Sequence, residues 1–291
     1  MIKYLKSLYH RRFFLAFGGL FMALSTENSF AGEIVRQPAV AGQFYTANPT
    51  ALKKEVQGYC ARGPDKASPL MLISPHAGYV FSGPVAGKGY ALLDKNIKTV
   101  ILVGPSHHEW FEGVAISDAD FYLTPLGRVP LAKELIARLR KNSVVHVVPA
   151  ADNPEHSLEV QLPFLQVALP AFSIVPIITG NVNPETVAQL VQPLLNSTTL
   201  VVASSDLSHY HSSGEAKAID GKTIQTVLAG DAGGFLDACG ETPIRIVMRL
   251  AAKSGLSPEL LDARNSFETA PQYGTEDRVV GYASIGYFKK K

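Results

Sequence analysis

The chain has 291 residues, of which 46% are apolar and 18% are charged, and its formal net charge is +2. This balance is that of an ordinary globular protein, and it excludes a disordered, collagen-like or coiled-coil chain. Because the net charge is so small, the composition offers no electrostatic footprint for nucleic acid, and we expect no nucleic-acid partner.

The first 31 residues have the pattern of a secretory signal peptide. Four basic residues precede an uncharged apolar run at 13–24, and Ser29 and Ala31 place small side chains at the −3 and −1 positions of a cleavage site after Ala31. The run is too short to cross a bilayer comfortably, which takes about 20 residues. We therefore expect a periplasmic or secreted protein, cleaved near Ala31 and without stable membrane insertion. A retained membrane anchor is the alternative.

Residues 32–291 are expected to form a single domain in which helices and strands alternate. Short apolar runs rich in β-branched residues predict strands, and amphipathic segments between them predict helices. The expected helices are at about 52–61, 131–141, 184–195, 214–228 and 242–253, and the expected strands are at 70–74, 99–104, 113–117, 144–148, 172–179, 199–204 and 279–287. Continuous apolar strands suit a sheet covered on both faces. This pattern predicts an α/β fold, a three-layer α/β/α sandwich with a mainly parallel or mixed central sheet.

Polar, histidine-bearing loops follow three of the predicted strands. His76 follows one strand, His107 and His108 follow a second, and Asp206 and His209 follow a third. If these strands are parallel, the three loops emerge at the same carboxyl edge of the sheet, where open α/β sheets place their ligands. A lone histidine is more often a surface or core residue, but three such loops together favour a metal site, since neutral imidazole is the commonest biological metal ligand.

Eight short motifs, taken together and in this order, resemble the Memo family, which includes the bacterial proteins called AmmeMemoRadiSam system protein B. Each motif alone is weak, but the likeness covers nearly all of residues 35–288. The motifs are AGQFY (41–45), PHAGY (75–79), GPSHH (104–108), TPLG (124–127), EHSLE (155–159), SSD (204–206), ACG (238–240) and VGYAS (280–284).

The resemblance implies a fold similar to that of the class III extradiol (LigB-type) non-haem iron dioxygenases. It implies a mononuclear metal site held by His76, His107 and Cys239, with Asp206 as an orienting group and His209 at the position of a catalytic base. The metal expected is copper or iron, and zinc is also compatible with a thiolate and two imidazoles. O₂-dependent oxidation of an unidentified small molecule is the implied chemistry, although the family has no settled physiological reaction and the enzyme assignment stays open. Affinity should fall at acid pH, since Cys239 binds as thiolate.

Four further residues are placed in the pocket or behind the ligands: His108, His156, Glu159 and Tyr79. Glu159 follows His156 by three residues, so the two share one face of a helix. That pair either supports the site or makes a structural contact. Tyr79 belongs to a group of aromatic residues that either lines the pocket or belongs to the core.

Cys60 and Cys239 present a competing interpretation. In an oxidising compartment two cysteines usually form a disulfide, which would remove the thiolate ligand. The Cys-Gly motif favours Cys239 as a ligand instead, and the sequence leaves both alternatives open.

Two other classes of function remain. Cys239 or Ser106 would serve as a nucleophile activated by a nearby histidine, but the chain has no Gly-x-Ser-x-Gly elbow. Alternatively, the pocket binds a peptide or buffers a metal without catalysis. Turnover discriminates these interpretations, because a binder holds its ligand stoichiometrically while an oxidase consumes O₂.

Overall fold

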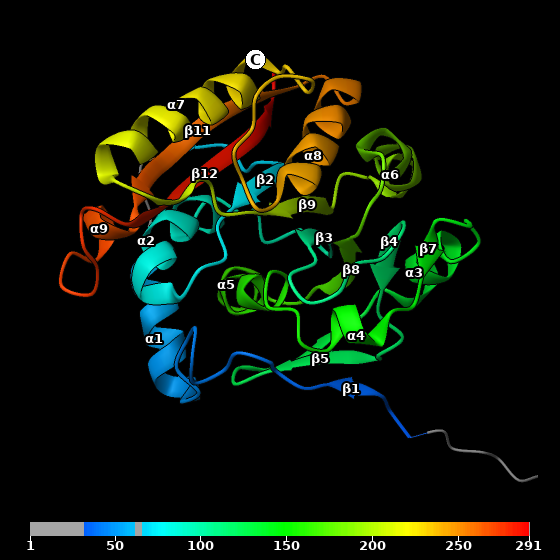
Figure 1. Cartoon of the computed structure of the whole chain (residues 1–291). Helices are drawn as coiled ribbons and strands as arrows, with labels where there is room; N and C mark the ends of the chain where they lie inside the picture. Colours follow the sequence, from blue (N-terminus) through cyan, green and yellow to red (C-terminus); the bar gives the residue numbers. More distant parts are fainter. Residues whose placement is uncertain (1–31, 62–65, 291) are drawn as a thin grey trace, which may run out of the picture. The chain divides into compact units, whose positions relative to one another are not determined.

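The structure is a computed structural model that describes residues 32–61 and 66–290 (Figure 1). The expected signal peptide, residues 1–31, lies outside the described residues, so cleavage near Ala31 stays a prediction. Glu33 begins a unit that contains every element discussed below. Within the described ranges, no helix has both the length and the apolar character needed to span a bilayer.

Four parallel strands form the middle of the central sheet. Each is a run of buried, mostly apolar residues, as expected for strands covered on both faces. They lie in the order β2 (Met71–Ser74), β9 (Thr199–Ser204), β3 (Thr99–Pro105) and β8 (Ser173–Thr179). Because these neighbours are parallel, the loops after β2, β3 and β9 do emerge at one edge, as the sequence predicts.

Strands of mixed direction extend this parallel core on both sides. β12 (Val279–Lys289) runs antiparallel to β2, and it also pairs with β11 (Leu256–Asn265) and β10 (His209–His211). On the other side, β4 (Val114–Ile116) runs antiparallel to β8 and pairs with β7 (Val145–His146). In the described ranges the sheet thus has nine strands and is mixed. A separate small sheet contains β1 (Val35–Arg36), β5 (Phe121–Thr124) and β6 (Gly127–Pro130).

Helices cover both faces of the central sheet, and the expected three-layer architecture is confirmed (Figure 1). One layer contains α6 (Pro184–Val191), α7 (Ser213–Ala229) and α8 (Glu241–Lys253), and the other contains α1 (Pro49–Tyr59), α2 (Tyr79–Tyr90) and α5 (Leu162–Ala168). Shorter helices lie in the connections: α3 (Lys133–Leu139), α4 (Pro149–Asp152), α9 (Ser266–Thr269) and the 3-10 turns Glu159–Gln161 and Gln192–Leu194.

Helix α2 was not predicted from the sequence, because its glycines and Pro84 are typical of a loop. The structure gives the glycines a packing role against α1. A Cβ added at Gly87 would lie 2.3 Å from the carbonyl oxygen of Tyr59, and one at Gly83 would lie 2.5 Å from the Tyr59 ring. The two helices can approach this closely only if these positions are glycine, although glycine has a low helix propensity.

A buried carboxylate anchors the segment that precedes α1. Glu159, fully buried, pairs with Arg36 (Nη1–Oε2 2.9 Å) and accepts hydrogen bonds from the backbone N–H groups of Ala39 and Val40 and from the Tyr45 hydroxyl. Four donors converge on this one side chain. Glu159 was expected either to support the site or to make a structural contact. These contacts favour the structural role.

We expect Glu159→Gln to lower the free energy of unfolding by about 3 kcal/mol, because it removes one of the two carboxylates that pair with the buried Arg36 guanidinium, the other being Asp152. Urea denaturation of the two proteins measures this difference. The matched control is Glu33→Gln, which removes an exposed ion pair to Arg128 and should change stability by less than about 0.5 kcal/mol. Equal effects of the two substitutions would contradict the anchoring role.

Candidate functional site

The carboxyl edge of the sheet brings together side chains from four separate segments. His76 lies two residues after β2, His107 two residues after β3 and Asp206 two residues after β9, while Cys239 lies just before α8. Ligand atoms of His76, His107 and Cys239 all lie within 4.8 Å of one another. The structure therefore places the three expected metal ligands as one group.

His76 and Cys239 form the buried side of this group. The Sγ atom of Cys239 lies 3.2 Å from Nε2 of His76, and the His76 side chain is 2% exposed. The loop that carries Cys239 is pressed against β9, since a Cβ added at Gly240 would lie 2.6 Å from the Ser204 carbonyl oxygen. The Cys-Gly pair in the sequence thus has a physical reason: glycine lets the thiol reach the histidine.

His107 is held by Glu155, which belongs to the EHSLE motif but was not among the predicted site residues. Its Nδ1 atom lies 2.9 Å from Oε1 of Glu155, and its backbone N–H donates to Oε2 at 2.7 Å. Burial would raise the pKa of Glu155, but the hydrogen bonds from His107 and from the Ser157 N–H hold it at about 2. The carboxylate therefore keeps its charge and fixes the His107 ring with Nε2 free.

His156 packs a third imidazole against the other two. Its ring stacks on His107 with centroids 4.6 Å apart and meets the edge of His76 at 5.5 Å. Burial, reinforced by the neighbouring imidazoles, lowers the pKa of His156 to about 4 and lowers that of His76 well below 6.5. Both rings are neutral at physiological pH, which is the state in which imidazole binds a metal.

A second group of possible ligands, His107, Glu155 and His156, shares a histidine with the first. In it, Oε1 of Glu155 lies 2.9 Å from Nδ1 of His107 and 3.4 Å from Nδ1 of His156. Hydrogen bonding accounts for this geometry, because both carboxylate oxygens already accept N–H groups. We therefore interpret this group as the support of His107.

Asp206 supports His76 through the backbone. Its Oδ1 atom accepts the N–H groups of His76 (2.7 Å) and Ala77 (3.3 Å), and burial raises its pKa to about 7. The orienting role predicted for Asp206 thus acts on the backbone that carries His76, while the ring of His76 contacts Ser204, with Nδ1 and Oγ 2.9 Å apart.

A β-bulge sets the direction of His209. In the pairing of β10 with β12, His209 lies opposite Val280 and His211 opposite Val279, so Tyr210 is an extra residue. Tyr210 has a φ of 65°, a left-handed conformation that is rare outside glycine. In a regular strand the two histidines would share a face, and the bulge places them on opposite faces.

Burial is the main cause that lowers the pKa of His209 below 6.5, and the nearby His107 acts in the same direction. The lowered pKa favours the neutral form of the His209 imidazole. Such a ring can accept a proton at physiological pH.

The remaining expected site residues lie apart from this group. His108 is exposed at the rim, where its ring is 6.4 Å from that of His156. Tyr79 is in the core: its ring packs on Phe164 and its hydroxyl donates to the Val160 carbonyl. Of the two alternatives for Tyr79, pocket or core, these contacts favour the core, because α2 turns its first residue inward.

Both cysteines are free in the structure. Cys60 caps the end of α1, where its N–H donates to the Val56 carbonyl at 2.9 Å, and burial raises the pKa of its thiol to about 12. Cys239 is thus available to the histidines.

Cys239 is one of the residues that line an open cavity of about 420 Å³. The exposed ring of Trp110, the chain's single tryptophan, lines it together with Glu109 and Asn181. This size falls within the range of small-molecule sites, about 300–1,000 Å³. A small molecule can therefore approach the thiol from solvent.

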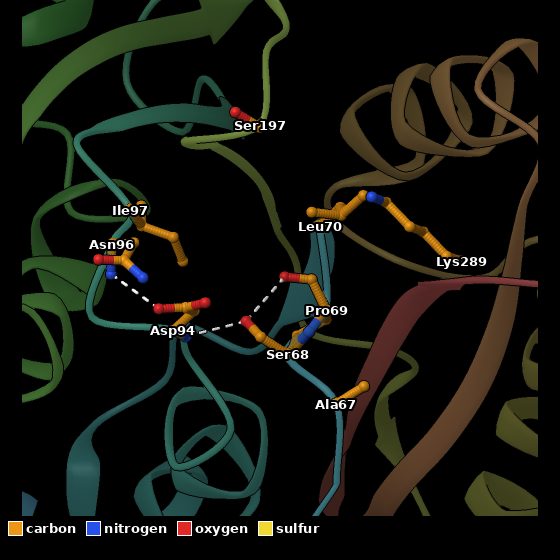
Figure 2. A pocket seen from close by; sticks show the side chains of 9 residues that line it. All are labelled: Ala67, Ser68, Pro69, Leu70, Asp94, Asn96, Ile97, Ser197 and Lys289. Atoms are coloured by element: carbon orange, nitrogen blue, oxygen red, sulfur yellow. Dashed lines mark hydrogen bonds between the residues drawn. The ribbon is translucent and has the colours of Figure 1, made fainter.

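A different cavity, of about 290 Å³, lies at the opposite edge of the sheet (Figure 2). Leu70 and Ile97 line it just before β2 and β3 begin, so the length of a strand, about 20 Å, separates it from the histidines. Two of its polar side chains already accept hydrogen bonds from its own wall: Ser68 Oγ accepts the Asp94 N–H, and Asp94 Oδ1 accepts the Asn96 N–H. We therefore place the functional site at the histidine edge.

Comparison with known proteins identifies the family. The sequence profile of the Memo-like proteins matches residues 36–286. The chain belongs to the Memo family. It is 35% identical to a MEMO1 family protein of Archaeoglobus fulgidus over 269 residues, which cover 86% of this chain and 98% of that protein. MEMO1 family proteins of Methanosarcina barkeri (37% identical, 86% and 99% covered) and Thermoplasma volcanium (34% identical, 87% and 98% covered) are similar to the same extent.

Membership of the Memo family confirms the resemblance drawn from the motifs, and every site residue lies inside the matched range. The family does not by itself assign a reaction. What the residues can do therefore rests on their own geometry and charge.

The pH dependence of stability should isolate Asp206. Because its pKa rises from 3.8 to about 7 on folding, its contribution to stability is present below pH 4 and is lost as the pH rises through 7. Without metal, the wild type should lose this contribution between pH 5 and pH 8, and Asp206→Asn should not. The unfolding free energy of the variant minus that of the wild type should therefore increase by roughly 2–3 kcal/mol from pH 5 to pH 8.

His76 and His156 titrate in the opposite sense, since their lowered pKa values remove stability as the pH falls. They are common to both proteins and cancel in the comparison. A difference between variant and wild type that does not change with pH would contradict the raised pKa of Asp206.

Proposed function

We propose that the chain binds one transition-metal ion through His76, His107 and Cys239. The observation that carries this proposal is the convergence of two imidazoles and a thiol within 4.8 Å, each imidazole with Nδ1 already in a hydrogen bond. Nε2 is then the free donor atom on both rings. Metal-binding histidines usually hydrogen-bond through their other ring nitrogen. Here the Glu155 carboxylate contacts His107, and the Ser204 hydroxyl contacts His76.

The chemistry of these donors fits copper best, with iron and zinc as further candidates. A thiolate with two imidazoles favours softer ions, Cu(I) and Zn(II) above all, over hard ions such as Mg²⁺. Burial, together with the nearby Asp206, raises the pKa of the Cys239 thiol to about 12. Binding must therefore release a proton, so the affinity should fall as the pH falls.

A bound copper or iron ion would supply redox chemistry toward O₂, and we propose that the protein catalyses an O₂-dependent oxidation of a small molecule. In this proposal His209 accepts a proton from the substrate as a neutral imidazole. Glu155 keeps a negative charge beside His107 and so favours positive charge at the ligands. The cavity lined by Trp110 admits the substrate to Cys239.

A non-catalytic function of the same pocket is the second candidate. Large aromatic side chains are exposed close in sequence to the site residues: Trp110 follows His107 by three residues, Tyr210 follows His209, and Phe235 precedes Cys239 by four. Exposed aromatic residues at a pocket rim are typical of surfaces that bind a peptide. In this alternative the site holds a peptide or stores a metal ion without consuming O₂.

Metal content is the first prediction of the proposal. The purified protein should bind about one equivalent of Cu(I) or Fe(II). His76→Ala and Cys239→Ala should each weaken binding by more than the roughly 10- to 100-fold that follows loss of a group behind a ligand. Elemental analysis and competition with a chromogenic chelator measure stoichiometry and affinity.

His146→Ala and Cys60→Ala are the matched controls, because both residues lie outside the converging group. They should leave metal binding unchanged. Stoichiometric metal in Cys239→Ala, or equal losses in the two controls, would contradict this site.

The proposed role of His209 is tested separately. We expect His209→Gln to keep the metal but to slow reductant-dependent O₂ uptake by roughly 10²- to 10⁴-fold, because a proton acceptor is lost. His211→Gln, which alters the neighbouring histidine across the bulge, is the control. Absence of O₂ uptake by the metal-loaded wild type would favour the non-catalytic alternative.

We also propose that the protein is exported, on the basis of the pattern in residues 1–31. The intact mass of the protein recovered from its native host tests this. A mass that begins after Ala31 supports export, and a mass that includes residue 1 contradicts cleavage.

A further inference from the structure

We propose that Ser204, held by Gln161, fixes the ring proton of His76 on Nδ1, so that Nε2 faces Cys239 as a lone pair. Both are positioning residues that the sequence motifs do not assign. The inference rests on the proposed metal-binding function, since a lone pair at Nε2 is what a metal ion requires.

The hydrogen bonds of the Ser204 hydroxyl decide where the ring proton lies. A hydroxyl has one proton to donate and two lone pairs that accept. Ser204 Oγ donates to the Ser157 carbonyl at 2.6 Å and accepts from Gln161 Nε2 at 2.8 Å. Its proton is thus already used, and the His76 Nδ1 atom at 2.9 Å must be the donor in their contact.

Gln161 is itself locked in one orientation. Its Nε2 atom also donates to the Pro75 carbonyl at 2.9 Å, and its Oε1 atom accepts from the Tyr90 hydroxyl at 2.7 Å. A reversed amide would set its oxygen against the Pro75 carbonyl oxygen, and neither can donate. Because Gln161 is fully buried, no solvent is available to relieve that contact.

The tautomer of His76 with its proton on Nε2 is disfavoured, because it costs a buried hydrogen bond. It would need the Ser204 proton to turn toward Nδ1, which leaves the Ser157 carbonyl unpaired in a fully buried place. An unpaired buried group disfavours such an arrangement by at least roughly fivefold and up to about a hundredfold. Nε2, 3.2 Å from Sγ of Cys239, therefore stays free of its own proton.

The tautomer is measured directly by long-range ¹H–¹⁵N correlation spectra of metal-free, ¹⁵N-histidine-labelled protein, with His76 assigned by comparison with His76→Gln. We expect the wild type to show the Nδ1–H form. Ser204→Ala should show a mixture, and Ser204→Thr, which keeps the hydroxyl, should restore the single form. An Nε2–H form in the wild type overturns the proposal, whatever the variants do.

Ser157→Ala is the matched control for loss of a buried hydroxyl. It removes the Ser157 side-chain bond to the Pro105 carbonyl but keeps the backbone carbonyl that Ser204 uses. This variant should retain the Nδ1–H form. A mixture in Ser157→Ala as large as that in Ser204→Ala would overturn the assignment.

Competition for Cu(I) against a chromogenic chelator links the tautomer to metal binding. Affinity should fall by roughly 10- to 100-fold in Ser204→Ala and change less than about threefold in Ser204→Thr and Ser157→Ala. Unchanged affinity in Ser204→Ala, despite a mixed tautomer, would overturn the positioning role. A wild type that shows the Nδ1–H form but binds no metal would support the tautomer assignment while it overturns the proposed function, so the two failures are distinguishable.

Discussion

Parallel pairing of β2, β9 and β3 is the constraint on which the site depends. Neighbouring strands lie about 4.8 Å apart, so three strand ends in a row fall within roughly 10 Å of one another. His76, Asp206 and His107 each follow their strand by two residues, and so they meet without any long loop. Cys239 joins them from a segment remote in sequence, and Gly240 makes that approach possible.

The same edge of the sheet holds two buried carboxylates in opposite states. Glu155 accepts N–H groups and the ring of His107, and its pKa is about 2. Asp206 is also buried, but its hydrogen bonds are two backbone N–H groups accepted by Oδ1, and burial raises its pKa to about 7. One group is therefore a permanent negative charge behind a proposed ligand, while the other is close to its protonation midpoint at neutral pH. Paired acids separated in this way are typical of functional sites.

The sequence predicted the parts of the fold that depend on local patterns. Apolar, β-branched runs located the four central strands, because strands covered on both faces need such residues. Helix α2 was missed, since its glycines are needed for contact with Tyr59 in α1, a contact between different elements. Strand β11 was also missed, because it lies at the edge and carries Pro258, Glu259 and Asp262 rather than an apolar run.

The site was also predicted in part. The strand-end loops indicated His76 and His107, and the resemblance to the Memo family supplied Cys239. The roles of Ser204 and Gln161 were not predicted, because their partners come from distant segments, although Ser204 begins the SSD motif. Glu155 did leave a signal, as a carboxylate beside His156 in a motif, but sequence alone does not show which histidine it contacts.

X-ray absorption spectroscopy of the Cu(I)-loaded protein tests the central claim most directly, since it reports the atoms bound to the metal. The account predicts one sulfur and two imidazole nitrogens, with the sulfur contribution lost in Cys239→Ala and retained in Cys60→Ala. A spectrum of nitrogen and oxygen ligands without sulfur in the wild type would contradict the site formed by His76, His107 and Cys239.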